Sequence, residues 1–234
     1  QTARDNTRFN VQLDQLLVLR GSLGFLRGTA EMRGETIASA DIALGGGKGS
    51  AFRVAPAGQG RRKLGIYVPD LGLLLSDAGW LDGFAGSFFD FQGFYEDSKP
   101  NAPLEGNLRL GPYRLQTVTP RPDIGTLNST IEGLNRAGDA TQQFTGLDAV
   151  IVKVGDRMEL KNARTSGQSI GLTASGVLDT AKDMAHLRGV VVPAFALNNL
   201  LSNVPLLGPL LTGGKDGGVF AISYRLDGPF DDLK

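Results

Sequence analysis

Few residues in this chain of 234 could carry out acid–base or metal chemistry. There is one histidine, His186, and no cysteine. Histidine often serves as a general acid or base near neutral pH, but no motif here supplies His186 with a carboxylate partner. Zinc sites usually need three or four His or Cys ligands. We therefore expect His186 to be an exposed strand residue, or one bonded to the backbone, and we expect no metal site.

Paired carboxylates are the second kind of group that could do chemistry, because glycoside hydrolysis uses two of them. The acidic residues on or beside expected strands are Asp90, Glu96, Asp97, Asp231 and Asp232. Their spacing specifies no catalytic pair, and strand ends and loops are where solvated acids normally lie. These positions therefore do not predict a glycosidase.

A glycine-rich stretch, Gly45 to Ser50, has some likeness to a phosphate-binding loop. Gly49 interrupts the Gly-Lys-Ser/Thr step that such loops require, and no helix is expected after it. We interpret the stretch as a turn. Taken with the missing cysteine and the single histidine, this predicts a protein that is not an enzyme and has no cofactor.

The charge balance argues against nucleic acid as a partner. Lys and Arg together number 24, and Asp and Glu also number 24. Such a chain has no global field to attract a polyanion. The short cluster Arg61-Arg62-Lys63 is interpreted as a solvated turn before a strand.

The elements that must position these groups are mainly strands. There are 33 glycines, about twice the average usage of roughly 7%, which suits many short strands with tight turns. Alternation of apolar and polar residues begins at Arg8, with Phe9, Val11 and Leu13 facing one way, and predicts a half-buried strand there. Further strands are expected at 22–33, 36–44, 50–55, 63–68, 85–96, 104–118, 147–154, 157–163, 170–178, 184–192 and 219–226.

Three short helices are expected in the connections. Asp70 and Asp123 each follow a proline and precede apolar residues at helical spacing, so both are predicted N-caps, and Gly79 and Gly138 are predicted stops. The two strings PDLGLL and PDIGTL are either an internal repeat or the result of shared capping chemistry. The pattern as a whole predicts one domain over residues 1–234, as a closed barrel or a sandwich.

The third helix lies in the most apolar window, residues 189–214. Apolar side chains at helical spacing are Leu197, Leu200, Leu201 and Val204. Pro205 ends this helix, and an apolar turn follows that contains Leu206, Leu207, Leu210 and Leu211. Two prolines and several polar residues interrupt the window, so we do not expect it to span a membrane.

The strand at 85–96 carries aromatic side chains on both faces. Phe89, Phe91 and Tyr95 share one face, while Phe88 and Phe94 lie on the other. Apolar surface of this kind either closes into a dry core or lines a groove, and the hydrophobic effect favours burial in both cases.

Three strings stand out toward the end of the chain: the VVP step at 191–193, the run PLLGPLLTGG at 205–214, and the final strand that ends GPFDD at 228–232. They resemble the closing segment of AsmA-like envelope proteins, in particular those with a YhdP-type C-terminal region. The stretch LGIYVPDLGLLLSDAGWLDGFAGSFFDFQGFY is also similar to the family's pattern of helix, glycine and strand. Residues 1–60 are similar to the family only in their general character, without a matching string.

The resemblance implies a mainly β fold, in which a single, strongly curved antiparallel sheet of about 10–12 strands forms an open groove or partial barrel. Family members are anchored in the inner membrane of diderm bacteria and extend a β-rich periplasmic groove that is thought to carry phospholipid toward the outer membrane. We therefore expect a C-terminal periplasmic piece of a longer anchored protein, with phospholipid, membrane and envelope proteins as partners.

The resulting hypothesis is a non-enzymatic groove for acyl chains. Its expected lining is Phe89, Phe91 and Tyr95, and its expected lid or membrane-contacting tip is Leu197, Leu200, Leu201, Val204, Leu206, Leu207, Leu210 and Leu211. One alternative is a glycan-binding or glycan-active β-domain that uses Trp80, Tyr67, Tyr95 or Tyr113 for stacking. Another is a structural adaptor whose sheet edges pair with neighbouring β-segments.

Overall fold

The computed structural model describes residues 6–18, 21–81, 83–116, 141–168, 170–193 and 221–229. Its strands are β1 (Asn6–Leu13), β2 (Leu17–Val18), β3 (Gly21–Ser22), β4 (Leu26–Arg33), β5 (Thr36–Leu44), β6 (Ser50–Pro56), β7 (Arg61–Val68), β8 (Phe84–Gly86), β9 (Phe89–Glu96), β10 (Leu104–Leu110), β11 (Tyr113–Gln116), β12 (Thr141–Val154), β13 (Arg157–Gly167), β14 (Ile170–Asp179), β15 (Met184–Pro193) and β16 (Ile222–Pro229). The helices described are α1 (Gly46–Gly49) and α2 (Leu71–Asp77).

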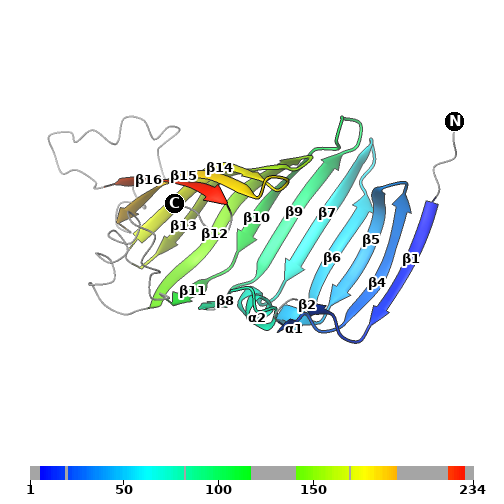
Figure 1. Cartoon of the computed structure of the whole chain (residues 1–234), viewed down its shortest axis with the longest axis horizontal. Coiled ribbons are helices and arrows are strands. Elements are labelled where there is room, and N and C mark those ends of the chain that lie inside the picture. The colour runs from blue at the N-terminus through cyan, green and yellow to red at the C-terminus, as the bar shows by residue number, and fades with distance from the viewer. Residues whose placement is uncertain are drawn as a thin grey trace.

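Fourteen of these strands form one antiparallel sheet that curves strongly and does not close into a barrel. Its main path runs β1-β4-β5-β6-β7-β9-β10-β12-β13-β14-β15-β16, so strands pair almost entirely in chain order, as Figure 1 shows from β1 at one end to β16 at the other. The expected curved antiparallel sheet is therefore confirmed. The closed barrel is wrong. The second sheet among the described residues consists only of the two-residue strands β2 and β3, which is too small to form a sandwich with the large one.

Bulges help to curve the sheet at its C-terminal side. The register shifts twice between β12 and β13 and once between β13 and β14, near Asn162. Asn162 has a φ of 52°, a left-handed conformation, and its N–H donates to Ser175 Oγ at 3.2 Å. A bulge adds a residue to one strand and increases the local bend and twist. In Figure 1 the strands from β12 to β16 accordingly run at an angle to the strands from β1 to β9.

Hydrogen bonds at both ends of helix α2 determine where it begins and ends. The carboxylate of Asp70 accepts a hydrogen bond from the Leu73 N–H at 3.1 Å, so the predicted N-cap is confirmed. At the other end, Gly79 has a φ of 65°, its N–H donates to Ser76 O and the Trp80 N–H donates to Leu75 O. This is a Schellman C-terminus, which glycine adopts without strain. Leu74 of the helix packs with Leu23 and Val68 and closes one end of the sheet's apolar face.

Several expected boundaries change in the structure. The strand expected at 85–96 is divided into β8 and β9. The strand pair or bent strand expected at 104–118, with its bend at Gly111 and Pro112, consists of β10 and β11, which are separated at those two residues. Strand β1 is exposed rather than half-buried, because it pairs only with β4. The expected glycine turn is the short α1, in which Gly47 and Lys48 have left-handed angles.

The two other expected helices, with the Asp123 cap and the Gly138 stop, lie outside the described residues. Among the helices that are described, none has the length and apolar character to cross a membrane.

Candidate functional site

The inner face of the sheet carries an uninterrupted apolar row. Residues that pair directly across neighbouring strands point to the same face of a sheet. Following the register from β1 to β16, one such row consists of Phe9, Ala30, Ala40, Val54, Leu64, Gly93, Gly106, Ile151, Leu160, Gly176, Leu187 and Leu226. No member of this apolar row is charged or carries a polar side chain.

Packing along the apolar row is densest at its middle. Val54 is 3% exposed and belongs to a cluster of five buried side chains with Ala40, Leu64, Phe91 and Leu104. The partly buried apolar side chains packed against this cluster are Ala30, Ile37, Ile42, Phe52, Ile66, Phe89, Tyr95, Leu108 and Ile151. The two facing glycines, Gly93 and Gly106, leave space that the Phe91 ring occupies, since a Cβ on Gly106 would lie 2.6 Å from that ring. No large side chain of the described residues is completely buried. Among the described residues, α2 and the segment around β2 and β3 pack against one end of this face only.

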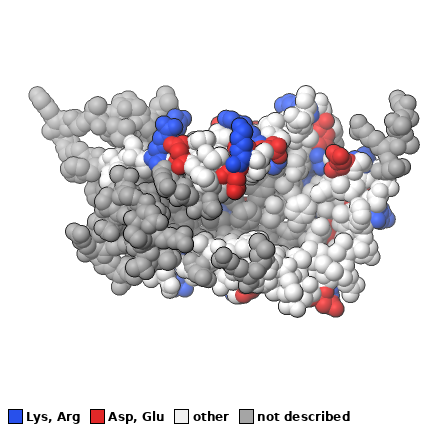
Figure 2. Space-filling model, viewed as in Figure 1, with Lys and Arg blue, Asp and Glu red and all other residues white. Residues whose placement is uncertain are grey.

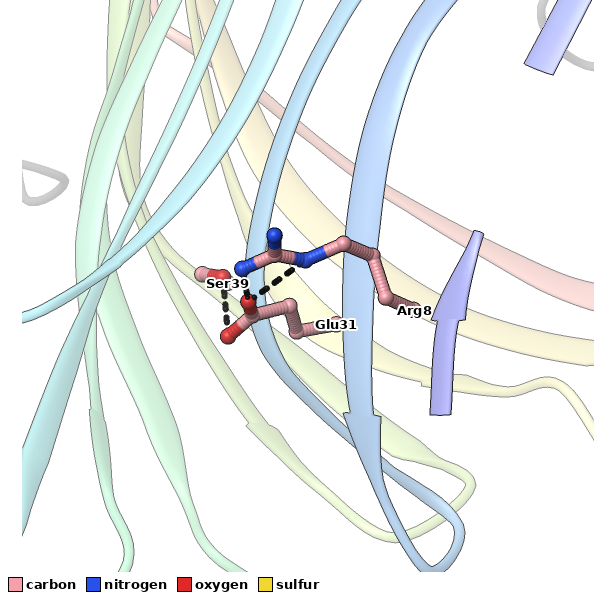
Figure 3. A network of polar contacts seen from close by, with 3 residues as sticks. All are labelled: Arg8, Glu31 and Ser39. Carbon is pink, nitrogen blue, oxygen red and sulfur yellow. Dashed lines mark hydrogen bonds and ion pairs between the residues drawn. The ribbon is translucent and has the colours of Figure 1, made fainter. Parts of the chain in front are cut away.

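The opposite face is polar and exposed. Arg53 pairs with Asp41, and Arg109 pairs with Asp148, in both cases with more than half of each side chain exposed. At the N-terminal edge Arg8 donates to Glu31, which also accepts from Ser39 Oγ at 3.4 Å, so one network joins β1, β4 and β5 (Figure 3). In Figure 2, charged side chains of both signs lie along the upper rim of the molecule. The sheet thus separates an apolar surface from a polar one.

The three expected lining residues do share the inner face. Phe91 is 5% exposed and lies in the packed middle of the apolar row, with Phe89 and Tyr95 against it. Tyr95 also lies under the guanidinium of Arg62, at 4.5 Å from ring centroid to Cζ. Arg62 in turn donates to both carboxylate oxygens of Asp97, at 2.8 and 2.7 Å. This cation and its carboxylate end the apolar surface beside Tyr95.

Aromatic side chains on the polar face have local partners. Phe94 lies under the Arg61 guanidinium at 4.5 Å, and Phe88 stacks on Tyr67 with 6.5 Å between ring centroids. Cation–π and stacking contacts stabilise such rings at partly exposed positions. The polar face therefore does not supply a second apolar groove at these residues.

An aromatic column that the sequence patterns did not assign to the inner face lies at its lower end. Tyr113 stacks between Phe84, at 5.2 Å, and Phe144, at 4.9 Å. Its hydroxyl is 2.9 Å from Thr165 Oγ1, and burial raises the pKa of Tyr113. The column is made by pairing of β8, β11 and β12, so only the long-range register brings these three rings together.

The eight expected lid residues, Leu197, Leu200, Leu201, Val204, Leu206, Leu207, Leu210 and Leu211, lie outside the described residues.

His186 has a side-chain partner that the sequence did not indicate. Its Nδ1 lies 2.7 Å from Asp227 Oδ1, because His186 and Asp227 are paired across β15 and β16. Hydrogen bonds from His186 and then Arg225 hold the pKa of Asp227 below its usual range. The expectation of an exposed strand residue is confirmed, since the His186 side chain on β15 is 56% exposed, whereas its carboxylate partner was not expected. Among the described residues, no hydrogen bond joins this pair to a serine or threonine hydroxyl.

The other acids considered for catalysis are paired with cations or amides. Glu96 pairs with Arg61 at 2.7 Å, Asp97 pairs with Arg62, and Asp90 accepts from Gln92 at 2.9 Å. Asp231 and Asp232 lie outside the described residues. Across the ranges that the structure covers, no three His, Asp or Glu side chains form a group that could hold a metal ion.

The four aromatic residues considered for glycan stacking differ in how deeply they are buried. Tyr113 is buried in the aromatic column and Tyr95 is covered by Arg62, whereas Trp80 is 57% exposed and Tyr67 is also exposed. Three of the four expected stacking residues, Tyr67, Tyr95 and Tyr113, therefore already have another side chain against their rings.

Fold and site together define a single-layered, open antiparallel sheet with one apolar and one polar face. No family model, curated protein or solved structure matches this chain.

Proposed function

We propose that the inner face binds the acyl chains of phospholipid, and that the chain is a non-enzymatic part of an envelope protein that conducts lipid between the inner and outer membranes. The observation that carries the proposal is the apolar row, which crosses all twelve strands of the main path without a polar side chain. A packed core needs apolar residues only where two layers meet. Here the apolar surface continues to both edges of a single layer.

Acyl chains suit this surface energetically. Burying a methylene group stabilises a complex by about 0.8 kcal/mol, and the interaction has no directional requirement. A surface that binds by this effect needs no fixed polar groups, which agrees with the side chains along the apolar row. The partly buried Leu160, Leu187 and Leu226 at its C-terminal end retain area that a ligand would cover.

The resemblance to AsmA-like proteins supports the same function. The residues at 191–193, 205–214 and 228–232 are similar to the C-terminal segment of the family's sequences. On this basis we place the chain in the periplasm, as part of a protein anchored in the inner membrane, with phospholipid, membrane and other envelope proteins as its partners.

A role as an adaptor is favoured by a separate observation and is compatible with lipid binding. Strands β1 and β16 end the pairing order of the described strands. An edge strand offers unpaired N–H and C=O groups to which another β-segment can add. Such addition would lengthen the apolar row, because Phe9 and Leu226 already extend it to both edges.

The test is photocrosslinking from two adjacent positions. Ile151 belongs to the apolar row, whereas Val152 points to the polar face between Glu105 and Glu159. Both side chains are half-buried. A benzophenone amino acid at position 151 is expected to crosslink phospholipid during expression, and the same group at position 152 is not.

Mass spectrometry of each purified variant measures the result. Equal crosslinking from both positions, or none from position 151 in a variant with the circular dichroism of the unmodified protein, would contradict lipid binding at the inner face.

A further inference from the structure

Strands β13 to β16 form a shallow pocket on the polar face of the sheet. Its volume is about 550 Å³. Charged and polar side chains from all four strands line it, among them Lys161, Ser175, His186, Arg188, Arg225 and Asp227. The pocket lies on the side of the sheet opposite the apolar row, because its His186 and Asp227 are the sequence neighbours of Leu187 and Leu226.

Two arginines lie directly opposite each other in this pocket. Arg188 of β15 is paired in register with Arg225 of β16. Like charges at directly opposed positions destabilise a sheet. Arg225 donates from Nε to Asp227, but Arg188 has no hydrogen bond or ion pair among the described residues. The pocket therefore holds a cation whose charge the described chain leaves unbalanced.

The acidic groups of the pocket are already engaged. Asp227 accepts from Arg225 and lies 2.7 Å from His186 Nδ1. Glu159 is 3.5 Å from Lys161 Nζ. Neither carboxylate is bonded to Arg188. In the strand register, Asp227 and Glu159 lie in one cross-strand row, and Arg188 and Arg225 lie in the next row on the same face. An anion from outside the chain is what would relieve the repulsion between Arg188 and Arg225.

We propose that Arg188 and Arg225 bind a phosphate group in this pocket. A guanidinium presents its N–H donors as a planar fork that matches the oxygens of phosphate, and two opposed forks can share one phosphate. Two sources supply this chemistry, the phosphodiester of a lipid headgroup and a free phosphate or phosphomonoester. The site is independent of acyl-chain binding, since it lies on the other face of the sheet.

Isothermal titration at constant ionic strength tests the proposal with two probes, inorganic phosphate and glycerophosphoglycerol, which is a soluble headgroup phosphodiester. Arg188→Gln is expected to weaken binding of the preferred probe by about tenfold or more, since a charge-assisted fork is lost. Arg53→Gln is the matched control, because Arg53 is also an exposed arginine on the polar face and lies on the distant β6. This control is expected to leave binding unchanged.

The probes also distinguish the source. Arg188-dependent binding of glycerophosphoglycerol indicates a lipid headgroup, and Arg188-dependent binding of inorganic phosphate alone indicates a free phosphate. The proposal is overturned if neither probe binds, or if Arg188→Gln and Arg53→Gln weaken binding equally. Arg188→Lys keeps the charge and removes the fork, so it provides a second variant, and unchanged affinity in that variant would overturn bidentate recognition.

Discussion

Asp70 fixes the start of α2 by two contacts. It accepts from the Leu73 N–H at 3.1 Å and pairs with Lys48 Nζ at 2.9 Å. Replacing an N-cap by alanine usually lowers the free energy of unfolding by about 0.5–2 kcal/mol, and we expect Asp70→Ala to do so at neutral pH. Urea denaturation measures the loss. Asp70→Asn is the control, since asparagine keeps the capping oxygen and removes only the charge.

The stability that the charge of Asp70 contributes is expected to depend on pH. A hydrogen bond from Lys48, followed by the one from the Leu73 N–H, lowers the pKa of Asp70. A carboxylate with a lowered pKa in the folded state contributes stability above its unfolded pKa of about 3.9, and that contribution disappears as the pH falls through the folded pKa. The difference between the wild type and Asp70→Asn should therefore narrow below about pH 4. A difference that stays constant from pH 7 to pH 3 would show that the charge is irrelevant.

Among single residues, capping chemistry was predictable and long-range pairing was not. The proline before Asp70 and the apolar spacing after it indicate a helix start within a few residues. His186 and Asp227 are 41 residues apart in the sequence, and only the register of β15 with β16 places them together. No local pattern specifies that register, so the sequence could not assign the histidine its partner.

Strand β16 is held to the sheet by a tyrosine that reaches across a glycine. Tyr224 is paired with Gly189 of β15, and its hydroxyl donates to Thr173 O of β14 at 2.8 Å. A Cβ on Gly189 would lie 1.8 Å from that same carbonyl oxygen and 2.6 Å from the tyrosine hydroxyl. The glycine therefore allows one side chain to connect three strands.

We expect Gly189→Ala to lower the free energy of unfolding by about 2 kcal/mol or more, because the backbone of β15 must move to relieve the clash. Gly65→Ala is the matched control. Gly65 is also within a strand, and its added Cβ would meet only the Gln92 side chain at 3.4 Å. Thermal or urea denaturation of both variants decides the matter, and equal stability of the two would refute this role of Gly189.

At the level of strands, period-two alternation predicted most elements and the faces on which their side chains lie. The alternation correctly predicted that Phe89, Phe91 and Tyr95 lie on the same face of the sheet. The expected count of 10–12 agrees with the main path, but the short β2, β3 and β8 were not separated as strands. Two-residue and three-residue strands are defined by their partners rather than by their own sequence, and bulges such as the one at Asn162 leave no clear alternation.

The whole sheet is organised along one direction, because strands pair with their neighbours in chain order. In such an array each strand is stabilised by the strands beside it, and end strands have one neighbour only. We expect amide hydrogen exchange to be slowest in β7, β9 and β10, whose Leu64, Phe91 and Leu104 are buried in the densest packing. Exchange should be fastest in β1 and β16. Mass spectrometry of exchanged peptides measures this gradient, and uniform protection from edge to edge would contradict it.

The division of the molecule into two faces could be predicted from the alternation of residues, whereas the open form of the sheet was expected only from the family resemblance. Alternation in each strand specifies an apolar side, but the same alternation is required of a closed barrel and of a sandwich. The strand path and the curvature decide between them, and both depend on pairings between distant segments.

A sheet of one layer is also mechanically compliant. Bending a two-layered sandwich requires its packed side chains to slide past each other, whereas the described strands form one layer that can flex about axes parallel to them. The hydrogen bonds between neighbours are preserved in such bending, because they resist separation of strands rather than rotation between them. The width of the inner face can therefore change by bending of the sheet. Under the proposed function, acyl chains of differing bulk would be accommodated by such bending, without rearrangement of any strand pair.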